Sequence, residues 1–240
     1  MDITNVTREA RKLLKLKYCG AVIVAAGSAS RMGGIDKVMA ELGGEPMVVR
    51  TVRTFEECDA IKEIVIVTRQ DLIVPIMSLC AGFRKVTAVV AGGRERSASV
   101  NAGLNALSSK VKLVAVHDGA RPLITWQVID RVVRAANSYG AAAPAVPVKD
   151  TIKTVRGGVV METPDRNMLQ AVQTPQVFDF DILRGALKKA GEDGLQLTDD
   201  CSAVEHLGIG VKIVEGHEHN LKVTTQTDLA IARMIVEGNT

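Results

Sequence analysis

Short apolar runs alternate with longer segments of helical periodicity along most of the chain. The apolar runs predict strands at Ala21–Ala26, Ile61–Thr68, Val86–Val90, Leu113–Val116 and Ala141–Val146. The helical pattern predicts helices at Met47–Phe55, Asp71–Cys80, Ala98–Leu107, Gln127–Ser138, Asp181–Ala190, Asp199–Leu207 and Asp228–Val236. This alternation is typical of a doubly wound α/β fold with a mostly parallel, Rossmann-like sheet.

One segment breaks the alternation. Residues Lys149–Val172 contain two short β runs, Asp150–Val155 and Val159–Glu162, which are joined at Arg156-Gly157-Gly158. A Gly-Gly pair between β-branched residues indicates a hairpin. Because an isolated two-stranded hairpin is marginally stable in water, it needs a surface to lie on, and a second copy of the chain would supply one. We therefore predict a β-arm at about 149–172 and a homodimer formed through it.

The remaining residues show no repeat and no linker. We predict a single domain at 18–240, which includes the arm, preceded by an N-terminal extension at 1–17. The extension lacks the apolar centre and cleavage site of a secretory signal. No apolar run approaches the roughly 20 residues that cross a bilayer.

Composition agrees with this fold and narrows the partners. Of the 240 residues, 47% are hydrophobic but only 3% are aromatic, so the core must consist of aliphatic side chains, as in strands that are buried on both faces. A net charge of +3 does not favour nucleic acid or an acidic membrane as a partner. The four cysteines are far apart and form no C-x-x-C pair, which favours reduced thiols and a cytoplasmic protein.

The loop after the first predicted strand has the composition of a phosphate-binding loop. Its small residues Ala25, Ala26 and Gly27 allow backbone N–H groups to approach phosphate oxygens. Arg31 and Lys37 add positive charge. The loop has neither the G-x-G-x-x-G spacing of dinucleotide sites nor the Gly-Lys-Ser/Thr of a P-loop. The alternative is a glycine-rich turn with solvated basic residues.

Two further clusters follow the third and fourth predicted strands, so we expect them at the same carboxyl edge of the sheet. The first is Gly92–Val100, in which Ser99 either caps the next helix or faces a base. The second contains Asp118, a suitable ligand for Mg²⁺, and Arg121, which is suited to a phosphate. We assign no chemistry to the neighbouring His117.

Seven short motifs occur in order along the chain, from about Tyr18 to Glu237: AAG-x-x-x-RM…K, GG-x-x-R-x-x-SV, HD-x-AR, D-T-I-K, DRN…TPQ, TDD and N-x-KVT. In type and order these motifs resemble those of a known family, 2-C-methyl-D-erythritol 4-phosphate cytidylyltransferase. The resemblance implies a nucleotide-binding α/β domain whose β-arm embraces a second subunit. It also implies transfer of CMP from CTP to a sugar-alcohol phosphate, with Mg²⁺.

The resemblance assigns the nucleotide side of the site. Arg31 and Lys37 match the catalytic pair that stabilises the transferring phosphate. Ala26, Gly93 and Ser99 match positions that contact ribose and cytosine, largely through the backbone.

The resemblance also assigns the acceptor side. Asp118 matches the metal-associated aspartate. Arg121, Thr151, Arg166 and Lys222 match positions that hold the methylerythritol phosphate, and Arg166 and Lys222 supply catalytic charge. Thr151 and Arg166 would reach the site from the neighbouring subunit's arm.

Two polar positions have more local interpretations. Thr198-Asp199-Asp200 opens a predicted helix, and capping by Thr or Asp accounts for it. Asn220 lies two residues before Lys222 and is a candidate contact to the metal or the phosphate.

Three alternative functions are compatible with parts of this sequence. A sister cytidylyltransferase that acts on ribitol 5-phosphate or a related pentitol phosphate would share the nucleotide loops, but the D-T-I-K and DRN motifs favour methylerythritol phosphate. An NAD-binding oxidoreductase is disfavoured by the incomplete glycine pattern. A non-catalytic nucleotide sensor is disfavoured by the joint presence of Arg31, Lys37, Asp118, Lys222 and the acceptor-side Arg166.

Overall fold

The computed structural model describes residues 15–27 and 37–238, and most of the predicted extension therefore lies outside the described residues. Within them, an eight-stranded sheet has the order β10-β7-β11-β6-β1-β4-β5, with β12 also paired to β7. The strands of this sheet are β1 (Cys19–Val24), β4 (Ile61–Thr68), β5 (Val86–Ala91), β6 (Leu113–Asp118), β7 (Ala141–Pro147), β10 (Gln170–Val172), β11 (Gln176–Asp179) and β12 (Lys212–Glu215).

The sheet is mainly parallel, as predicted. Strand β1 lies between β4 and β6, and it is parallel to both; β5 is parallel to β4 and β12 to β7. Only β10 and β11 run antiparallel to their neighbours. These two strands and β12 were not predicted, and they extend the sheet on the β6 side.

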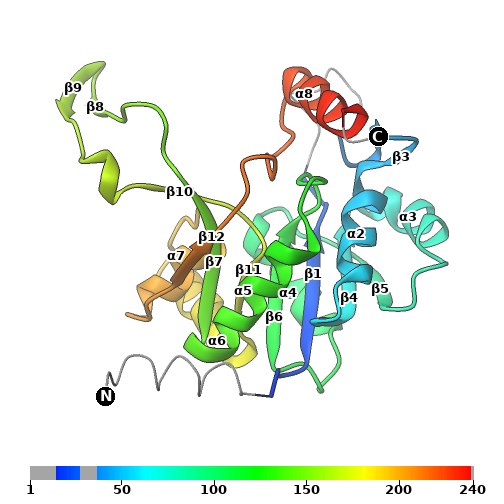
Figure 1. Cartoon of the computed structure of the whole chain (residues 1–240). Coiled ribbons are helices and arrows are strands. Elements are labelled where there is room, and N and C mark those ends of the chain that lie inside the picture. Colours follow the sequence, from blue (N-terminus) through cyan, green and yellow to red (C-terminus); the bar gives the residue numbers. More distant parts are fainter. Residues whose placement is uncertain (1–14, 28–36, 239–240) are drawn as a thin grey trace, which may run out of the picture.

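Helices cover both faces of this sheet (Figure 1). Along β1, Ala21 and Ile23 belong to the core on one face and Val22 to the core on the other, because successive side chains of a strand point to opposite sides. The first face is covered by α2 (Met47–Glu57), α3 (Ile73–Leu79) and α5 (Trp126–Tyr139). The second face is covered by α4 (Arg96–Ala106), α6 (Phe180–Glu192) and α7 (Asp200–His206).

The last helix belongs to a smaller apolar cluster. Leu229 and Ala232 of α8 (Gln226–Glu237) pack with Leu42 and Met47, beside the short pair β2 (Glu41–Leu42) and β3 (Glu45–Pro46). Three short 3₁₀ segments complete the described elements: η1 (Lys37–Met39), η2 (Gln70–Leu72) and η3 (Arg166–Met168). None of the helices described has the length and apolar character that a membrane crossing requires.

Backbone hydrogen bonds tie together the loops at the carboxyl edge of the sheet. Ala25 N donates to Val67 O at 2.7 Å, and Gly92 N donates to Thr68 O at 2.7 Å. The approach is close enough to require glycine, since a Cβ added at Gly92 would lie 2.5 Å from the Cβ of Ala26. The loops after β1, β4 and β5 are therefore fixed against one another.

The predicted hairpin is present as β8 (Thr154–Arg156) and β9 (Val159–Glu162). Gly157 and Gly158 join them at φ values of 57° and 81°, which glycine adopts readily and which a two-residue hairpin turn of this kind requires. The first strand is shorter than the predicted run Asp150–Val155, because pairing ends at Thr154 opposite Glu162. The hairpin stands away from the central sheet (Figure 1).

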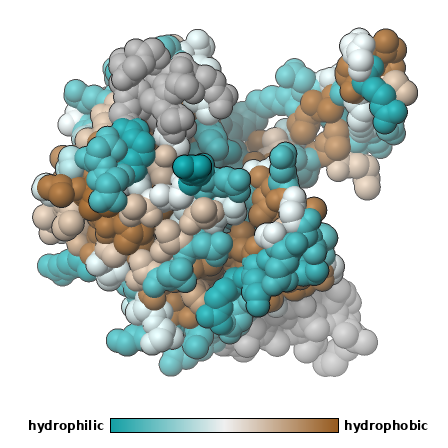
Figure 2. Space-filling view, turned by 180° about the vertical axis from the view of Figure 1, so that it is seen from behind, coloured by the Kyte–Doolittle hydropathy of each residue, from teal (hydrophilic) through white to brown (hydrophobic). Residues whose placement is uncertain are grey.

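Apolar side chains are exposed on this hairpin and on the segment that returns to the sheet, and Figure 2 shows them as brown areas on the projecting part. They are Val155, Val159, Val160, Met161 and Met168.

Candidate active site

A pocket of about 630 Å³ opens where the loops of the carboxyl edge meet. Its lining residues are Val24, Ala25, Ala26, Gly27, Val38, Arg69, Gln70, Gly92, Gly93, Arg94, Glu95, Arg96, Ser99, Asp118, Ala120 and Lys222. Seven of the twelve predicted site residues are among them: Ala25, Ala26, Gly27, Gly93, Ser99, Asp118 and Lys222.

Of the two predicted catalytic residues in the first loop, the structure describes only the backbone of Lys37. Arg31 lies outside the described residues. Lys37 begins η1, directly before the lining residue Val38, but its side chain is outside the described part of the structure.

Ser99 supports the glycine loop and does not cap the helix. It lies in the first turns of α4, whose N-cap is Glu95, so the capping interpretation was wrong. The Gly93 N–H donates to Ser99 Oγ at 3.1 Å, and Ser99 Oγ donates to Glu95 O at 3.2 Å. The buried hydroxyl therefore holds the backbone of Gly93 against α4.

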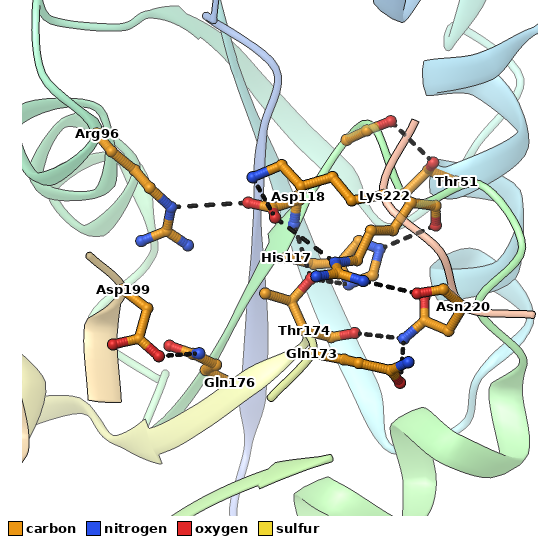
Figure 3. Close-up of polar contacts among 12 residues, drawn as sticks. Thr51, Arg96, His117, Asp118, Gln173, Thr174, Gln176, Asp199, Asn220 and Lys222 are labelled. Atoms are coloured by element: carbon orange, nitrogen blue, oxygen red, sulfur yellow. Dashed lines mark hydrogen bonds and ion pairs between the residues drawn. The ribbon is translucent and has the colours of Figure 1, made fainter. Parts of the chain in front are cut away.

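Asp118 is surrounded by three cations. Lys222 Nζ lies 2.9 Å from Oδ2, Arg121 Nε lies 3.6 Å from Oδ2, and Arg96 Nε lies 3.6 Å from Oδ1 (Figure 3). Burial opposes ionisation of the carboxyl, but Lys222 and Arg96 outweigh it and lower the pKa of Asp118 to about 2. Asp118 is thus an anion at any physiological pH.

A buried network beneath Asp118 fixes its backbone (Figure 3). The Asp118 N–H donates to Thr174 Oγ1 at 3.1 Å, and Thr174 Oγ1 lies 3.0 Å from His117 Nδ1. His117 Nε2 lies 3.2 Å from Arg121 O, which only accepts, so Nε2 carries the proton and Nδ1 accepts from Thr174. Burial lowers the pKa of His117 to about 3, so the ring is neutral and serves as a structural link.

Asn220 anchors the loop that carries Lys222. It is fully buried, and its Nδ2 donates to Thr174 O at 2.9 Å and to Gln173 Oε1 at 3.2 Å. The backbone carbonyl oxygen of Asn220 accepts from Arg121 Nη1 at 2.6 Å. The expectation that Asn220 contacts a metal or a phosphate was wrong, because its amide is turned into the protein and away from the pocket.

Arg121 lies beside the pocket and not among its lining residues, held between Asp118 and Asn220. Thr151 and Arg166 lie on the exposed segment around the hairpin, and Arg166 Nη1 donates to Lys149 O at 2.9 Å. The chain does not bring these last two residues to its own pocket.

Sequence reasoning missed two charged residues of the site. Arg96 lines the pocket, and its Nη1 donates to Asp200 Oδ2 at 2.7 Å. Burial raises the pKa of the Asp200 carboxyl, whereas Arg96 opposes this rise. The available signal was membership of the quoted motifs, since Arg96 is the arginine of GG-x-x-R-x-x-SV and Asp200 is the last residue of TDD. Only helix capping had been assigned to the TDD motif.

The donor set around Asp118 limits the kind of metal site. In the part of the chain described, no group of three or more His, Cys, Asp or Glu side chains is placed to hold a metal ion. Mg²⁺ is commonly bound by only one or two carboxylates together with substrate phosphates. An ionised Asp118 therefore fits a divalent cation that arrives with a polyphosphate.

Comparisons with known proteins agree with the geometry. A model of the 2-C-methyl-D-erythritol 4-phosphate cytidylyltransferase family matches residues 19–238. The chain is 49% identical to the protein of that name from Symbiobacterium thermophilum over 218 residues, which cover 90% of this chain and 92% of that protein. It is 45% identical to the protein of the same name from Geobacillus kaustophilus, over 90% of this chain and 96% of that one.

Solved structures extend the similarity to the fold. The crystal structure of 4-diphosphocytidyl-2C-methyl-D-erythritol synthase from Anaerococcus prevotii matches with a TM-score of 0.84 at 31% identity, covering 92% of this chain and 96% of that one. The 2-C-methyl-D-erythritol 4-phosphate cytidylyltransferase of Thermus thermophilus matches with a TM-score of 0.77 at 31% identity, covering 92% and 99%. The resemblance found in the sequence is confirmed, and the chain belongs to the 2-C-methyl-D-erythritol 4-phosphate cytidylyltransferase family.

Proposed function

We propose that the chain transfers CMP from CTP to 2-C-methyl-D-erythritol 4-phosphate and releases pyrophosphate, in the synthesis of isoprenoid precursors. The observation that carries this proposal is the convergence of Asp118 and Lys222 with the loops at Ala25 and Gly93 in one pocket. Its basic lining suits a triphosphate, since charged groups in a cleft attract a ligand of opposite sign. Membership of the family supplies the donor and the acceptor.

The reaction requires little of the protein beyond positioning and charge. An oxygen of the acceptor phosphate forms a bond to the α-phosphorus of CTP. The bond from that phosphorus to the oxygen shared with the β-phosphate breaks, and pyrophosphate leaves with the electron pair. Because the acceptor phosphate is already an anion near neutral pH, no residue has to remove a proton from it, and catalysis rests on orientation and charge stabilisation.

The residues divide this work. Ala25, Ala26 and Gly27 offer backbone N–H groups, while Gly93 and Ser99 shape the base and ribose end. Arg31, Lys37 and Lys222 neutralise the negative charge that collects around the α-phosphorus. Asp118 would hold Mg²⁺ together with the triphosphate, and the metal would supply further charge neutralisation. Arg121 would hold the acceptor phosphate.

We also propose a homodimer in which residues 18–240 form one domain and the arm completes the partner's site. This proposal is supported by the exposed Thr151 and Arg166, which lie apart from the pocket of their own chain, and by the apolar side chains on the hairpin. The free thiols of all four cysteines support a cytoplasmic location.

Subunit mixing tests the shared site. A Lys37→Ala chain lacks a working pocket, and an Arg166→Ala chain lacks a working arm. If sites are shared, the mixed dimer contains one intact site, so a 1:1 mixture of the two inactive variants should regain about a quarter of wild-type activity. An inactive mixture of dimers that exchange subunits, or a monomer at micromolar concentration, would contradict the proposal.

The reaction itself is tested by following pyrophosphate release with Mg²⁺. Release is expected with CTP and 2-C-methyl-D-erythritol 4-phosphate, and not when ATP, GTP or UTP replaces CTP. Faster release with ribitol 5-phosphate as the acceptor would assign the chain to the sister activity.

A further inference from the structure

Asp200 is a buried carboxylate that contacts Arg96, one of the lining residues of the pocket. It is the first residue of α7, it is only 1% exposed, and it accepts a hydrogen bond from Arg96 Nη1 at 2.7 Å. The two residues are 104 positions apart in the sequence, and their contact joins the start of α7 to the start of α4. A carboxylate buried this deeply requires a charged partner, and Arg96 is that partner.

Arg96 links this carboxylate to the pocket. Its side chain remains 27% exposed and lines the pocket, with Nε facing Asp118 Oδ1 at 3.6 Å. A guanidinium carries five N–H donors in a rigid fork, but among the described residues only Nη1 donates a hydrogen bond. Nε faces Asp118 (Figure 3), and the remaining N–H groups, which make no hydrogen bond among the described residues, are available to a ligand in the pocket.

The support for Asp200 comes from the central sheet. Gln176 Oε1 of β11 accepts from the backbone N–H groups of Asp200 at 2.9 Å and of Cys201 at 3.0 Å. Gln176 Nε2 donates to Asp199 Oδ2 at 2.7 Å (Figure 3). Because β11 pairs with β6, the strand that ends in Asp118, the position of Asp200 is fixed relative to the pocket.

We propose that Arg96 binds phosphate oxygens of the nucleotide and that Asp200 is a positioning residue that holds the Arg96 guanidinium for this contact. The inference rests on the proposed function and extends it, since it adds a cation to Arg31, Lys37 and Lys222. Arginine suits the role because its planar fork faces the buried carboxylate on one side and a phosphate on another. Without Asp200, the long side chain of Arg96 would leave this orientation.

A double-mutant cycle on CTP binding tests the proposal. Wild type, Asp200→Asn, Arg96→Gln and the double variant are titrated calorimetrically with CTP and Mg²⁺. Loss of a hydrogen-bonded ionic contact to phosphate predicts that each single variant binds CTP about 10- to 100-fold more weakly. If Asp200 acts through Arg96, Asp200→Asn changes CTP affinity less than about twofold in the Arg96→Gln background.

The matched control is Asp181→Asn. Asp181 lies in the first turn of α6 and pairs with Arg184 at 2.8 Å, but this pair is exposed and lies outside the nucleotide pocket. The Asp181→Asn variant should bind CTP as tightly as wild type does. This result would show that an Asp→Asn change at the start of a helix does not by itself weaken CTP binding.

The outcomes separate the two proposals. Equal losses of affinity from Asp200→Asn in both backgrounds, or no loss, would overturn the positioning role and leave the proposed function intact. A folded wild type that does not bind CTP would overturn both. If Asp200→Asn does not fold, CTP binding is measured with Arg96→Lys instead. Weaker CTP binding with an unchanged melting temperature supports the proposal, and wild-type affinity for CTP overturns it.

Discussion

Replacing Asn220 with alanine tests whether the buried network sets the position of Lys222. The variant removes the amide that donates to Thr174 O at 2.9 Å and to Gln173 Oε1 at 3.2 Å. Gln173 Oε1 retains the N–H of His217 at 3.4 Å as a donor, whereas Thr174 O loses its side-chain donor. The loop that carries Lys222 is then tied to the sheet mainly by its backbone contacts.

The size of the effect follows from these contacts. A buried acceptor left without a partner costs about 1–3 kcal/mol, and the second lost hydrogen bond adds about 1 kcal/mol. The free energy of unfolding should therefore fall by about 2–4 kcal/mol, which for a chain of this length lowers the melting temperature by roughly 10 °C. Since misplacement of a catalytic group by about 1 Å can cost 10²-fold in rate, kcat/KM should fall by about two orders of magnitude.

Urea unfolding and steady-state kinetics measure the two effects on the same preparation. The control is Asn105→Ala, which makes the same chemical change at an exposed position of α4 and should alter stability by less than about 0.5 kcal/mol. An Asn220→Ala protein that loses less than about 1 kcal/mol and keeps wild-type kcat/KM would refute the anchoring role.

Three further predictions concern charge and packing. The pKa of Asp118 is about 2 in the folded protein and about 3.9 in the unfolded chain. Ionisation of Asp118 therefore stabilises the fold above about pH 4, and this contribution is lost as the pH falls through about 2. The difference in unfolding free energy between wild type and Asp118→Asn should stay constant from about pH 5 to 8 and shrink below about pH 4 in urea titrations. Arg31→Ala and Lys37→Ala should fold normally and lose about 10²–10³ in kcat, and a variant with wild-type kcat would be removed from the catalytic set. Gly103→Ala places a Cβ 2.3 Å from Val22 Cγ1 in the core and should lower the unfolding free energy by about 1–3 kcal/mol, which thermal unfolding measures.

The parallel part of the sheet was predictable because its strands have a local signal. The run Ile61–Thr68 coincides with β4, since a strand buried on both faces consists almost entirely of apolar residues. Strands β11 and β12 have only four residues each, and β12 carries Lys212 and Glu215 at its ends. Their structure depends on pairing with β6 and β7, which are distant in the sequence, so no local pattern predicts them.

The site shows the same limit. The loops at Ala25 and Gly93 were predictable because close backbone approach demands small residues there. The capping interpretation of the TDD motif was correct for Asp199, whose side chain accepts from Ser202 N at 2.9 Å. It gave no indication that the next residue, Asp200, is buried against Arg96, because that contact joins distant parts of the chain. The burial of Asn220 was hidden for the same reason.

The most direct test of the central claim follows the label from CTP in the presence of Mg²⁺ and 2-C-methyl-D-erythritol 4-phosphate. With CTP labelled at the α-phosphorus, the label should appear in 4-diphosphocytidyl-2-C-methyl-D-erythritol; with CTP labelled at the γ-phosphorus, it should appear in pyrophosphate. Transfer of the γ-label to the acceptor, or release of α-labelled CMP without formation of the product, would contradict cytidylyl transfer as the reaction of this chain.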